Sequence, residues 1–378
     1  MAKRKGKSRE RIKDWHQRYD AGEEAEGAHA RRRSVTRRAV KLPVRQLASG
    51  QEGADDLPRR EGMVTGLFPG GAVVLAGADR LLCQIAKTFR APEGSSPLAV
   101  GDNVTVAMTA AAHAGGADQD DKDRSDGMIL MREPRATALA RPLPRSGKRR
   151  NEFDSDPFEK IIVANMDVLL IVASTREPAL RRGLIDRYLI AAERGELAPL
   201  LAVNKIDLAP APGAVLDDLA SRGLEVVPCS AARGDGMADL RAKLLGKRSV
   251  LAGASGVGKS TLINAMIPGA EAATRTVRPS DRRGRHTTSS AVVYDLDEGG
   301  IVVDTPGIRE LGLPLAAAEL PWYFPEFEQR SGQCKFNNCS HTHEPACAVI
   351  AAVEAGEIPK QRYDSYLRLL ETLDENQG

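Results

Sequence analysis

The sequence predicts a multidomain protein in which a small all-β barrel is followed by an α/β domain and then by a small α-helical domain. Short β-prone runs alternate with turn residues between residues 62 and 108, a spacing that is typical of a barrel. From residue 161 onwards, apolar runs alternate with helical segments, which indicates a parallel α/β sheet. Near the C-terminus, three of the five cysteines fall between residues 334 and 347. A chain of 378 residues can supply such domains with buried cores.

The composition is that of a soluble globular protein, with 42% hydrophobic and 28% charged residues. No apolar run approaches the length of about 20 residues that is needed to cross a bilayer. The basic N-terminus lacks the apolar stretch of a secretory signal. We therefore expect a cytoplasmic protein without membrane contact.

The N-terminal segment is strongly basic, although the whole chain carries a net charge of only +3. Residues 1–50 contain 15 Lys and Arg against 6 Asp and Glu, and they include few apolar residues that a fold could bury. Residues 1–58 are therefore predicted to form a disordered arm. Such an arm either binds RNA, because Lys and Arg displace counterions from phosphates, or is a solvated tail that aids solubility.

The barrel is predicted to comprise residues 59–141, with strand-like runs at 62–67, 72–75, 101–106 and 128–131. An oligonucleotide-binding (OB) barrel fits this spacing, and an SH3-like barrel fits it equally well. A Gly- and Asp-rich insertion at 113–127 has no apolar period and is expected to be a mobile loop. Residues 142–157 are polar and turn-rich, which predicts a linker to the next domain.

The α/β domain is predicted to comprise residues 158–314, with helices near 184–194 and 237–245. The runs expected to form its buried strands lie at 161–163, 168–172, 199–203, 224–227, 249–251 and 301–303. Open α/β sheets bind ligands at the carboxyl ends of their strands, so the residues that follow these runs are the candidates for a site.

A complete phosphate-binding loop follows the run at 249–251 and precedes a helix, which is the context that this motif requires. Its glycines allow backbone N–H groups to surround a β-phosphate, and the helix N-terminus adds its dipole. Lys259 is expected to place its ammonium between the β- and γ-phosphates, and Ser260 to offer its hydroxyl to Mg²⁺. This pattern alone predicts nucleoside triphosphate binding. The predicted nucleotide contacts are Gly253, Ala254, Ser255, Gly256, Val257, Gly258, Lys259, Ser260 and Thr261.

The tetrapeptide Asn204-Lys205-Ile206-Asp207 follows another buried run and predicts specificity for guanine. The Asp207 carboxylate can accept from N1–H and from the exocyclic amine of guanine, two donors that adenine lacks at this position. Asn204 is expected to brace the loop, and the stem of Lys205 to cover one face of the base. Ser230 and Ala231 fit a supporting element whose backbone contacts the guanine oxygen.

Two further segments complete a predicted GTP site. In Asp304-Thr305-Pro306-Gly307, Asp304 is expected to hold Mg²⁺ through water, and the Gly307 N–H to meet the γ-phosphate. Residues 284–288 read Gly-Arg-His-Thr-Thr and are predicted to form a switch loop. Within it Thr288, with Thr287 as the second candidate, is the expected Mg²⁺ ligand and sensor of the γ-phosphate.

The catalytic residue is harder to identify. Ile308 follows the Asp-x-x-Gly element, whereas many GTPases have a glutamine there that orients the attacking water. Because isoleucine can neither hydrogen-bond nor transfer a proton, we expect slow intrinsic hydrolysis and a partner that completes the site. His286 is the nearest candidate for positioning water, although it could equally serve only to order the switch loop. The predicted catalytic set is Lys259, His286 and Thr288.

The order of these motifs predicts a circularly permuted GTPase domain. The guanine element at 204–207 precedes the phosphate loop at 253–260, whereas in an ordinary GTPase the phosphate loop comes first. The permutation also leads the chain from Gly307 almost directly into the C-terminal segment. A change at the γ-phosphate could therefore be passed to whatever that segment touches.

The C-terminal segment contains the pattern Cys334-x4-Cys339-x-His341-x5-Cys347. Three thiolates and one imidazole form a closed tetrahedral set for one structural zinc ion. His343 lies between the same cysteines and is an alternative ligand. Residues 315–378 are predicted to form this zinc-binding domain, which ends in helices. The other two cysteines, Cys83 and Cys229, are predicted to be ordinary small buried residues.

These motifs together resemble the ribosome small-subunit-dependent GTPase A (RsgA) family over roughly residues 60–373. The motifs are, in chain order, Asn-Lys-Ile-Asp, Gly-x4-Gly-Lys-Ser, Gly-Arg-His-Thr-Thr, Asp-Thr-Pro-Gly and the set of three cysteines and one histidine. The resemblance implies an N-terminal OB-fold, a permuted GTPase domain and a C-terminal zinc domain whose ligands are Cys334, Cys339, His341 and Cys347. It also implies GTP and GDP as ligands, binding to the small (30S) ribosomal subunit and its rRNA, stimulation of hydrolysis by that subunit, and a role late in its maturation. His286 lies in the family's switch motif.

Two features depart from the family pattern. The basic arm of about fifty residues is longer than the family core needs, and the acidic insertion around Asp118–Asp126 places negative charge on a barrel that is expected to face RNA. Two alternative functions remain beside the leading one. The first is an RNA-binding switch whose GTP is turned over too slowly to matter unaided. The second is a permuted GTPase that acts on the large subunit. We expect the chain to be a monomer.

Overall fold

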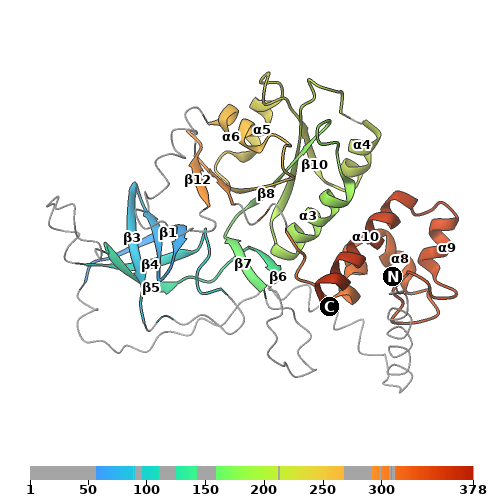
Figure 1. Cartoon of the computed structure of the whole chain (residues 1–378), viewed down its shortest axis with the longest axis horizontal. Helices are drawn as coiled ribbons and strands as arrows, with labels where there is room; N and C mark the ends of the chain where they lie inside the picture. The colour runs from blue at the N-terminus through green and yellow to red at the C-terminus, as the bar shows by residue number, and fades with distance from the viewer. Residues whose placement is uncertain are drawn as a thin grey trace, which may run out of the picture. The chain divides into compact units, whose positions relative to one another are not determined.

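The computed structural model describes residues 57–87, 89, 96–109, 125–142, 159–211, 213–267, 291–297, 299–305, 308 and 311–377. Figure 1 shows these residues in colour. Nearly all of the predicted arm, and most of the predicted insertion and linker, lie outside the described residues.

The first described part is a closed barrel of five strands in the order β1-β2-β3-β5-β4. Its strands are β1 (Arg59–Phe68), β2 (Gly71–Ala76), β3 (Asp79–Ile85), β4 (Asn103–Met108) and β5 (Gly127–Arg132). Neighbouring strands are antiparallel except for β3 and β5, which run parallel and close the barrel. The predicted barrel is confirmed, and its strand order is OB-like, which decides between the two barrels that the spacing allowed.

The barrel core follows from the alternation of side chains along each strand. Val64, Val74 and Ile129 are fully buried inside it, whereas Leu82 and Met128 point outward and are 48% and 38% exposed. Cys83 lies among the buried residues, as predicted.

A two-stranded sheet connects the barrel to the α/β domain. It pairs β6 (Ala138–Pro142) with β7 (Glu159–Ala164), so the last residues assigned to the barrel pair outside it instead. β7 also contacts the barrel, because the Ala164 N–H donates to the Val100 carbonyl at 2.8 Å. Gly101 makes this approach possible: its φ is +88°, and a Cβ there would lie 2.0 Å from the Ala164 carbonyl oxygen.

The α/β domain is built on a six-stranded sheet of order β10-β9-β8-β11-β13-β12. All neighbours run parallel except β12, which is antiparallel to β13 at the edge. The strands are β8 (Val168–Ser174), β9 (Ala198–Asn204), β10 (Glu225–Pro228), β11 (Arg248–Ala252), β12 (Val292–Asp295) and β13 (Ile301–Asp304). All seven residues of β8 are buried, as expected for an apolar strand that is covered on both faces.

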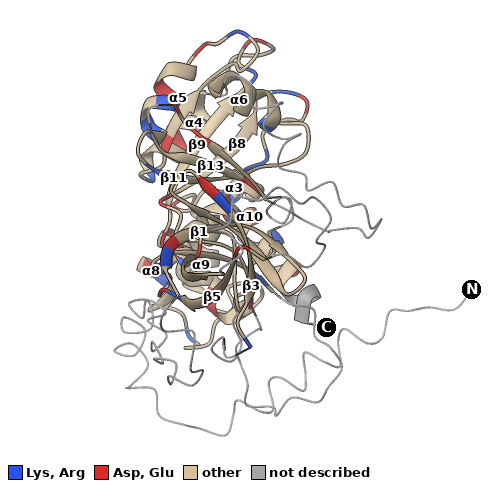
Figure 2. Cartoon of the chain, turned by 90° about the vertical axis from the view of Figure 1, so that its left-hand side faces the viewer, with Lys and Arg blue, Asp and Glu red and all other residues tan. Residues whose placement is uncertain are grey.

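Four helices accompany this sheet: α3 (Arg182–Gly195), α4 (Gly213–Ser221), α5 (Met237–Leu244) and α6 (Lys259–Met266). The helices predicted near 184–194 and 237–245 are confirmed as α3 and α5. Figure 2 shows acidic and basic positions close together around α5, where Lys243 pairs with Asp239 and Glu225.

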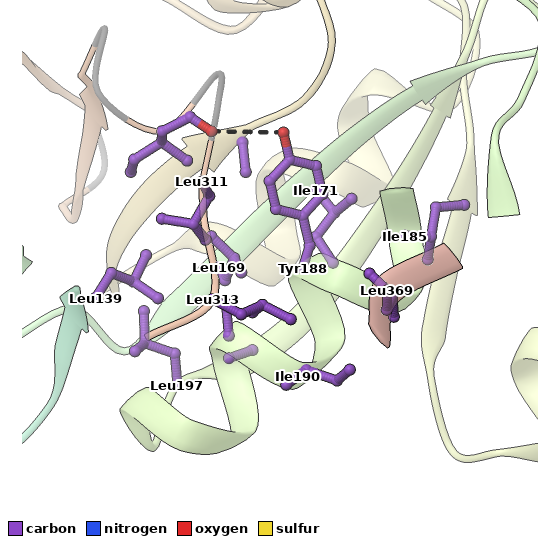
Figure 3. Packing of buried hydrophobic residues seen from close by; sticks show 14 of the residues in the cluster. Leu139, Leu169, Ile171, Ile185, Tyr188, Ile190, Leu197, Leu311, Leu313 and Leu369 are labelled. Carbon is purple, nitrogen blue, oxygen red and sulfur yellow. Dashed lines mark hydrogen bonds between the residues drawn. The ribbon is translucent and has the colours of Figure 1, made fainter. Parts of the chain in front are cut away.

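The C-terminal part is helical and packs on α3. Its elements are the 3₁₀ helix η4 (Ala317–Tyr323), α8 (Pro325–Ser331), α9 (Ala348–Glu354) and α10 (Lys360–Gln377). Figure 3 shows Tyr188 of α3 near Leu169 and Ile171 of β8 and Leu313 of the connecting segment, with Leu369 of α10 in the same buried cluster. Each buried leucine contributes about 1.5–3 kcal/mol relative to exposure, so this shared cluster joins the helices firmly to the sheet.

A buried polar contact reinforces the same junction. Asp186 of α3 accepts a hydrogen bond from Ser365 at 2.6 Å and forms ion pairs with Arg362 at 2.5 Å and Arg222 at 3.2 Å. The Arg362 guanidinium also lies over the Phe324 ring, 4.1 Å from its centroid. Within the described residues, no helix is both long and apolar enough to span a membrane.

Candidate functional site

The predicted nucleotide motifs meet at one edge of the sheet. β9 ends at Asn204, β10 leads into Cys229 and Ser230, β11 leads into Gly253, and β13 ends at Asp304. Because β10, β9, β8, β11 and β13 are all parallel, these carboxyl ends lie at the same edge. The permuted chain therefore brings together motifs that are far apart in the sequence.

The phosphate loop links β11 to α6. Lys259 is buried, and its ammonium donates to the carbonyls of Gly253 at 2.8 Å and Ala254 at 2.7 Å, which holds it against the start of the loop. Ser260, in the first turn of α6, is exposed. Gly258 has a φ of +95°, and a Cβ there would lie 2.4 Å from Asn204 Nδ2. Glycine at this position thus lets the guanine element approach the phosphate loop.

Asn204 connects the two recognition loops. Its Nδ2 donates to the Val257 carbonyl of the phosphate loop at 3.0 Å, and its Oδ1 accepts from the Ala231 N–H at 3.0 Å. The side chain is 2% exposed. A buried amide with both ends bonded fixes its neighbours, as the brace expected at this position should.

The Asp207 carboxylate is oriented by Ser230, whose hydroxyl donates to Oδ1 at 2.6 Å. The same hydroxyl oxygen accepts from the Arg233 N–H at 3.2 Å. The hydrogen bond from Ser230 lowers the pKa of Asp207 below its ordinary value, and the nearby positive charges of Arg233 and Lys205 act in the same direction. Asp207 is therefore an oriented, ionised acceptor at neutral pH.

The loop after β8 also contacts the guanine element, a feature for which the sequence carries no motif. Thr175 donates its hydroxyl to the Lys205 carbonyl at 2.7 Å and its N–H to the Asn204 carbonyl at 3.0 Å. Lys205 in turn donates its ammonium to the Glu177 carbonyl. These contacts join residues about thirty positions apart through backbone carbonyls, so only the fold shows them.

The segment after β13 is anchored in the core. Ile308 is fully buried, and its carbonyl accepts from the Tyr188 hydroxyl at 3.5 Å, the dashed line in Figure 3. Burial raises the pKa of Tyr188, so its hydroxyl stays protonated. The isoleucine side chain is thus a packing group. His286, Thr287, Thr288 and Gly307 lie outside the described residues.

The four predicted metal ligands come together in the loop between α8 and α9. The ligand atoms of Cys334, Cys339, His341 and Cys347 all lie within 4.8 Å of one another. The Cys334 and Cys347 sulfurs are 3.9 Å apart, and His341 Nδ1 lies 3.6 Å and 3.4 Å from them. A tetrahedral ion with bonds of about 2.0–2.3 Å separates its ligand atoms by about 3.5–3.8 Å, so this arrangement fits one such ion.

A second layer of contacts orients the histidine and the loop. His341 Nε2 lies 3.3 Å from the Ser331 hydroxyl, which itself donates to the Phe327 carbonyl at 2.7 Å. The Ser331 oxygen is then the acceptor for Nε2–H, which leaves Nδ1 free of a proton on the side of the thiols. From α10, Tyr363 donates to the His341 carbonyl at 2.8 Å and Tyr366 to the Ser340 carbonyl at 2.7 Å.

Glu344 holds the tip of this loop. Its carboxylate accepts from the Ser340 N–H at 2.7 Å, the Ser340 hydroxyl at 2.6 Å and the Thr342 N–H at 3.1 Å. Burial alone would raise the pKa of Glu344, but these hydrogen bonds lower it to about 2. His343, the alternative ligand, is exposed and contacts Thr342 Oγ1 through Nδ1 at 2.7 Å. The geometry therefore groups His341 with the three cysteines.

Known proteins resemble this chain over most of its length. Residues 133–314 match the family model described as RsgA GTPase. A relative from Chlorobaculum tepidum, named small ribosomal subunit biogenesis GTPase RsgA, is 41% identical over 320 residues, which cover 83% of this chain and 98% of the relative. A relative of the same name from Gemmatimonas aurantiaca is 38% identical over 283 residues, covering 74% of this chain and 86% of the relative.

Two solved structures are similar over most of their length. The crystal structure of YjeQ from Thermotoga maritima gives a TM-score of 0.60 at 30% identity, covering 84% of this chain and 99% of that chain. The structure of YloQ, described as a circularly permuted GTPase, gives a TM-score of 0.56 at 27% identity, covering 86% and 98%. The barrel, the permuted order of the motifs and these relatives agree: the chain belongs to the RsgA GTPase family.

Proposed function

We propose that this protein is a GTPase that binds the small ribosomal subunit and hydrolyses GTP to drive or check a late step of the subunit's maturation. The observation that carries the proposal is the junction made by Asn204, which bonds the guanine element to the phosphate loop in a permuted chain. The choice of the small subunit rests on the names of the relatives from Chlorobaculum tepidum and Gemmatimonas aurantiaca, which state small ribosomal subunit biogenesis.

The nucleotide site has separate groups for the base and the phosphates. Asp207 accepts the two guanine donors, Ser230 holds it in place, and the Ala231 N–H, which Asn204 Oδ1 shares, meets the guanine oxygen. Lys259 leaves the carbonyls of its own loop for the β- and γ-phosphates, which offer a charge-assisted contact. The Gly307 N–H meets the γ-phosphate.

Ser260 and Asp304 would hold Mg²⁺ together with the nucleotide, with Thr288 or Thr287 as the further ligand. The hydroxyl and the carboxylate suit this hard cation, and they lie at the same edge because β11 and β13 pair directly, with Leu251 opposite Asp304. Bound there, Mg²⁺ neutralises charge that develops on the β- and γ-phosphate oxygens.

Hydrolysis by the chain alone is slow. Ile308 is core, so it offers no group that orients the attacking water. His286 of the switch loop supplies this function when the small subunit is bound, and subunit binding thereby stimulates turnover.

The Cys334, Cys339, His341 and Cys347 set would hold one Zn²⁺ ion, which is structural because four protein ligands leave no open position. Both zinc and the tyrosines of α10 then fix the ligand loop. The C-terminal domain (315–378) and the OB barrel both contact rRNA, and the protein acts in the cytoplasm as a monomer. The basic arm (1–58) adds electrostatic attraction to RNA.

Two alternatives make different predictions. An RNA-binding GTP switch would bind the subunit in a nucleotide-dependent way without appreciable turnover, and buried Ile308 favours it. A permuted GTPase of the large subunit would bind that subunit instead.

Co-sedimentation with separated ribosomal subunits tests the proposal. We expect the protein to pellet with small subunits in the presence of a non-hydrolysable GTP analogue, less with GDP, and little with large subunits. Asp207→Asn should remove the effect of guanine nucleotides at the same concentrations. Preferential pelleting with large subunits, or pelleting that no nucleotide alters, would contradict the proposal.

A further inference from the structure

The loop at residues 174–178 lies against both recognition loops of the nucleotide site. Thr175 bonds the guanine element through its hydroxyl and its N–H, and the Glu177 carbonyl accepts from the Lys205 ammonium. Inside the loop, the Ser174 hydroxyl donates to the Pro178 carbonyl at 2.6 Å. Pro178 Cδ lies 3.5 Å from where a Cβ on Gly256 of the phosphate loop would be. This loop therefore forms a wall beside the site.

The Thr175 hydroxyl acts on one particular peptide unit. The Lys205 carbonyl, which accepts from Thr175 at 2.7 Å, belongs to the same peptide as the Ile206 N–H, which donates to the Cys229 carbonyl at 3.3 Å. Both polar ends of this peptide are thus held, one from β8 and the other from β10. Lys205 has a φ of +65°, a left-handed conformation that non-glycine residues rarely adopt.

This peptide adjoins the residues expected to contact guanine. It joins Lys205, whose ammonium donates to the Glu177 carbonyl, to Ile206, and the next residue is Asp207, whose carboxylate is held by Ser230. Without the Thr175 hydroxyl, this peptide is held only by the 3.3 Å bond from the Ile206 N–H to the Cys229 carbonyl, so it can tilt and shift the backbone that leads into Asp207. In that state Ser230 still holds the Asp207 carboxylate, but the backbone that carries this side chain is no longer fixed.

We propose that Thr175 is a positioning residue for guanine recognition: its hydroxyl fixes the peptide between Lys205 and Ile206 so that Asp207 meets both guanine donors. The inference rests on the proposed GTP site and identifies a residue outside its motifs. The proposed effect concerns recognition of the base and not of the phosphates, so the affinities for GDP and GTP should change equally. It should also depend on the exocyclic amine, which inosine nucleotides lack.

The test compares nucleotide affinities of the full-length chain for GDP, GTP and IDP. Thr175→Val removes the hydroxyl while keeping the shape of the side chain. One net hydrogen bond corresponds to a loss of about fivefold to tenfold in affinity, which we expect for GDP and GTP alike. The ratio of GDP to IDP affinity should fall towards one, because a displaced carboxylate no longer distinguishes the amine.

Three further variants separate positioning from stability. Thr175→Ser keeps the hydroxyl and should retain the wild-type ratio. Thr175→Ala also removes the hydroxyl but leaves a smaller side chain. It should lower the ratio of GDP to IDP affinity even if Thr175→Val folds poorly. Thr137→Val is the matched control, because Thr137, just before β6, is similarly half-buried and donates to the Met166 carbonyl at 2.6 Å. It should leave the ratio unchanged.

Equal losses of GDP and IDP affinity in the Thr175 variants would overturn the inference, since they would indicate a general structural role. Wild-type affinity in Thr175→Val would overturn it as well. Both results leave the proposed GTP site standing. If the wild-type chain instead showed no preference for GDP over ADP, the proposed function would fail, and the inference with it.

Discussion

The Asp207 carboxylate depends on a single hydroxyl. Ser230 donates to it at 2.6 Å and is itself fully buried, so the pair is pre-organised within the protein. Such a bond keeps the carboxylate both ionised and correctly aimed, and these two effects can be separated by pH.

Ser230→Ala should lower GDP affinity at pH 7 by about threefold to tenfold, the value of one typical hydrogen bond, because the Asp207 carboxylate is partly exposed to solvent. The hydroxyl lowers the pKa of Asp207, so the variant raises that pKa towards its ordinary value. The ionised form binds guanine, and the variant should therefore lose GDP affinity earlier than wild type as pH falls from about 5 to 3. Titration calorimetry over this range measures both effects. Parallel pH profiles would contradict the role given to Ser230, and Ser230→Thr, which keeps a hydroxyl, should follow wild type.

The two cysteines outside the metal cluster should be chemically inert in the folded protein. Burial raises the pKa of Cys83 to about 12, with Asp126 adding to the effect, and burial raises that of Cys229 to about 11. The thiolate fraction of each cysteine at pH 8 therefore falls by a factor of about 100 or more. Alkylation followed by peptide mass spectrometry should label neither thiol until the protein is unfolded. Rapid labelling of Cys229 in the native protein would contradict the packing.

At the level of elements, the metal loop and α10 support each other. The loop contributes Cys347, whose sulfur caps α9 by accepting from the Ile350 N–H at 3.5 Å, and α10 contributes the hydroxyls of Tyr363 and Tyr366. His341 and Ala346 both have positive φ, so the loop is not a conformation that its sequence prefers by itself.

Removal of the metal should therefore release the loop first. With a strong chelator we expect loss of about one equivalent of zinc, a decrease in helical circular dichroism from α9 and the start of α10, and exposure of three thiols. GDP affinity should change by less than about twofold, because the nucleotide site lies in another domain. Cys347→Ser should reproduce the chelated state, whereas Cys83→Ser should keep its metal. Full helix content in chelator would contradict the structural role of the ion.

How much the sequence predicts depends on how local each interaction is. The phosphate loop, the guanine element and the cysteine pattern are contiguous or closely spaced, so their residue types alone indicate their chemistry. Thr175 and Tyr188 act through backbone carbonyls of residues 205 and 308, and a carbonyl has no sequence signature. The choice between OB and SH3-like barrels needed the pairing of β3 with β5, because alternation along single strands is the same in both.

The position of β6 shows the same limit for an element. Its partner β7 begins only after residues 142–157, which read as a linker, and the pairing of Ala138 with Ala164 is a tertiary effect that no local pattern predicts. For the switch histidine and threonines, the sequence remains the only guide, since residues 286–288 lie outside the described part of the chain.

In the molecule as a whole, α3 joins the nucleotide site to the C-terminal domain. Tyr188 faces the segment that follows β13, while Asp186, two residues earlier, pairs with Arg362 and Ser365 of α10. Positions two residues apart lie on different sides of a helix, so α3 contacts both partners at once.

Asp186→Ala should loosen this junction. Its side chain is 4% exposed, and removing a buried partner of two arginines costs about 3–5 kcal/mol. Amide hydrogen exchange in α10 should accelerate by a factor of about 100 or more. Asp218→Ala is the control, because Asp218 also pairs with Arg222 and with Arg182 but is 37% exposed, so its loss should cost less than about 1 kcal/mol. Equal effects of the two variants would contradict the conclusion that the buried Asp186 carboxylate stabilises this junction.

GTP turnover by the full-length chain, measured alone and with separated small and large ribosomal subunits, tests the central claim most directly. We predict slow turnover alone and stimulation of about tenfold or more by small subunits only, since the subunit completes a site in which Ile308 is buried. Lys259→Ala should abolish the stimulated rate. Equal turnover under every condition, or stimulation by the large subunit, would contradict a GTPase of small-subunit maturation.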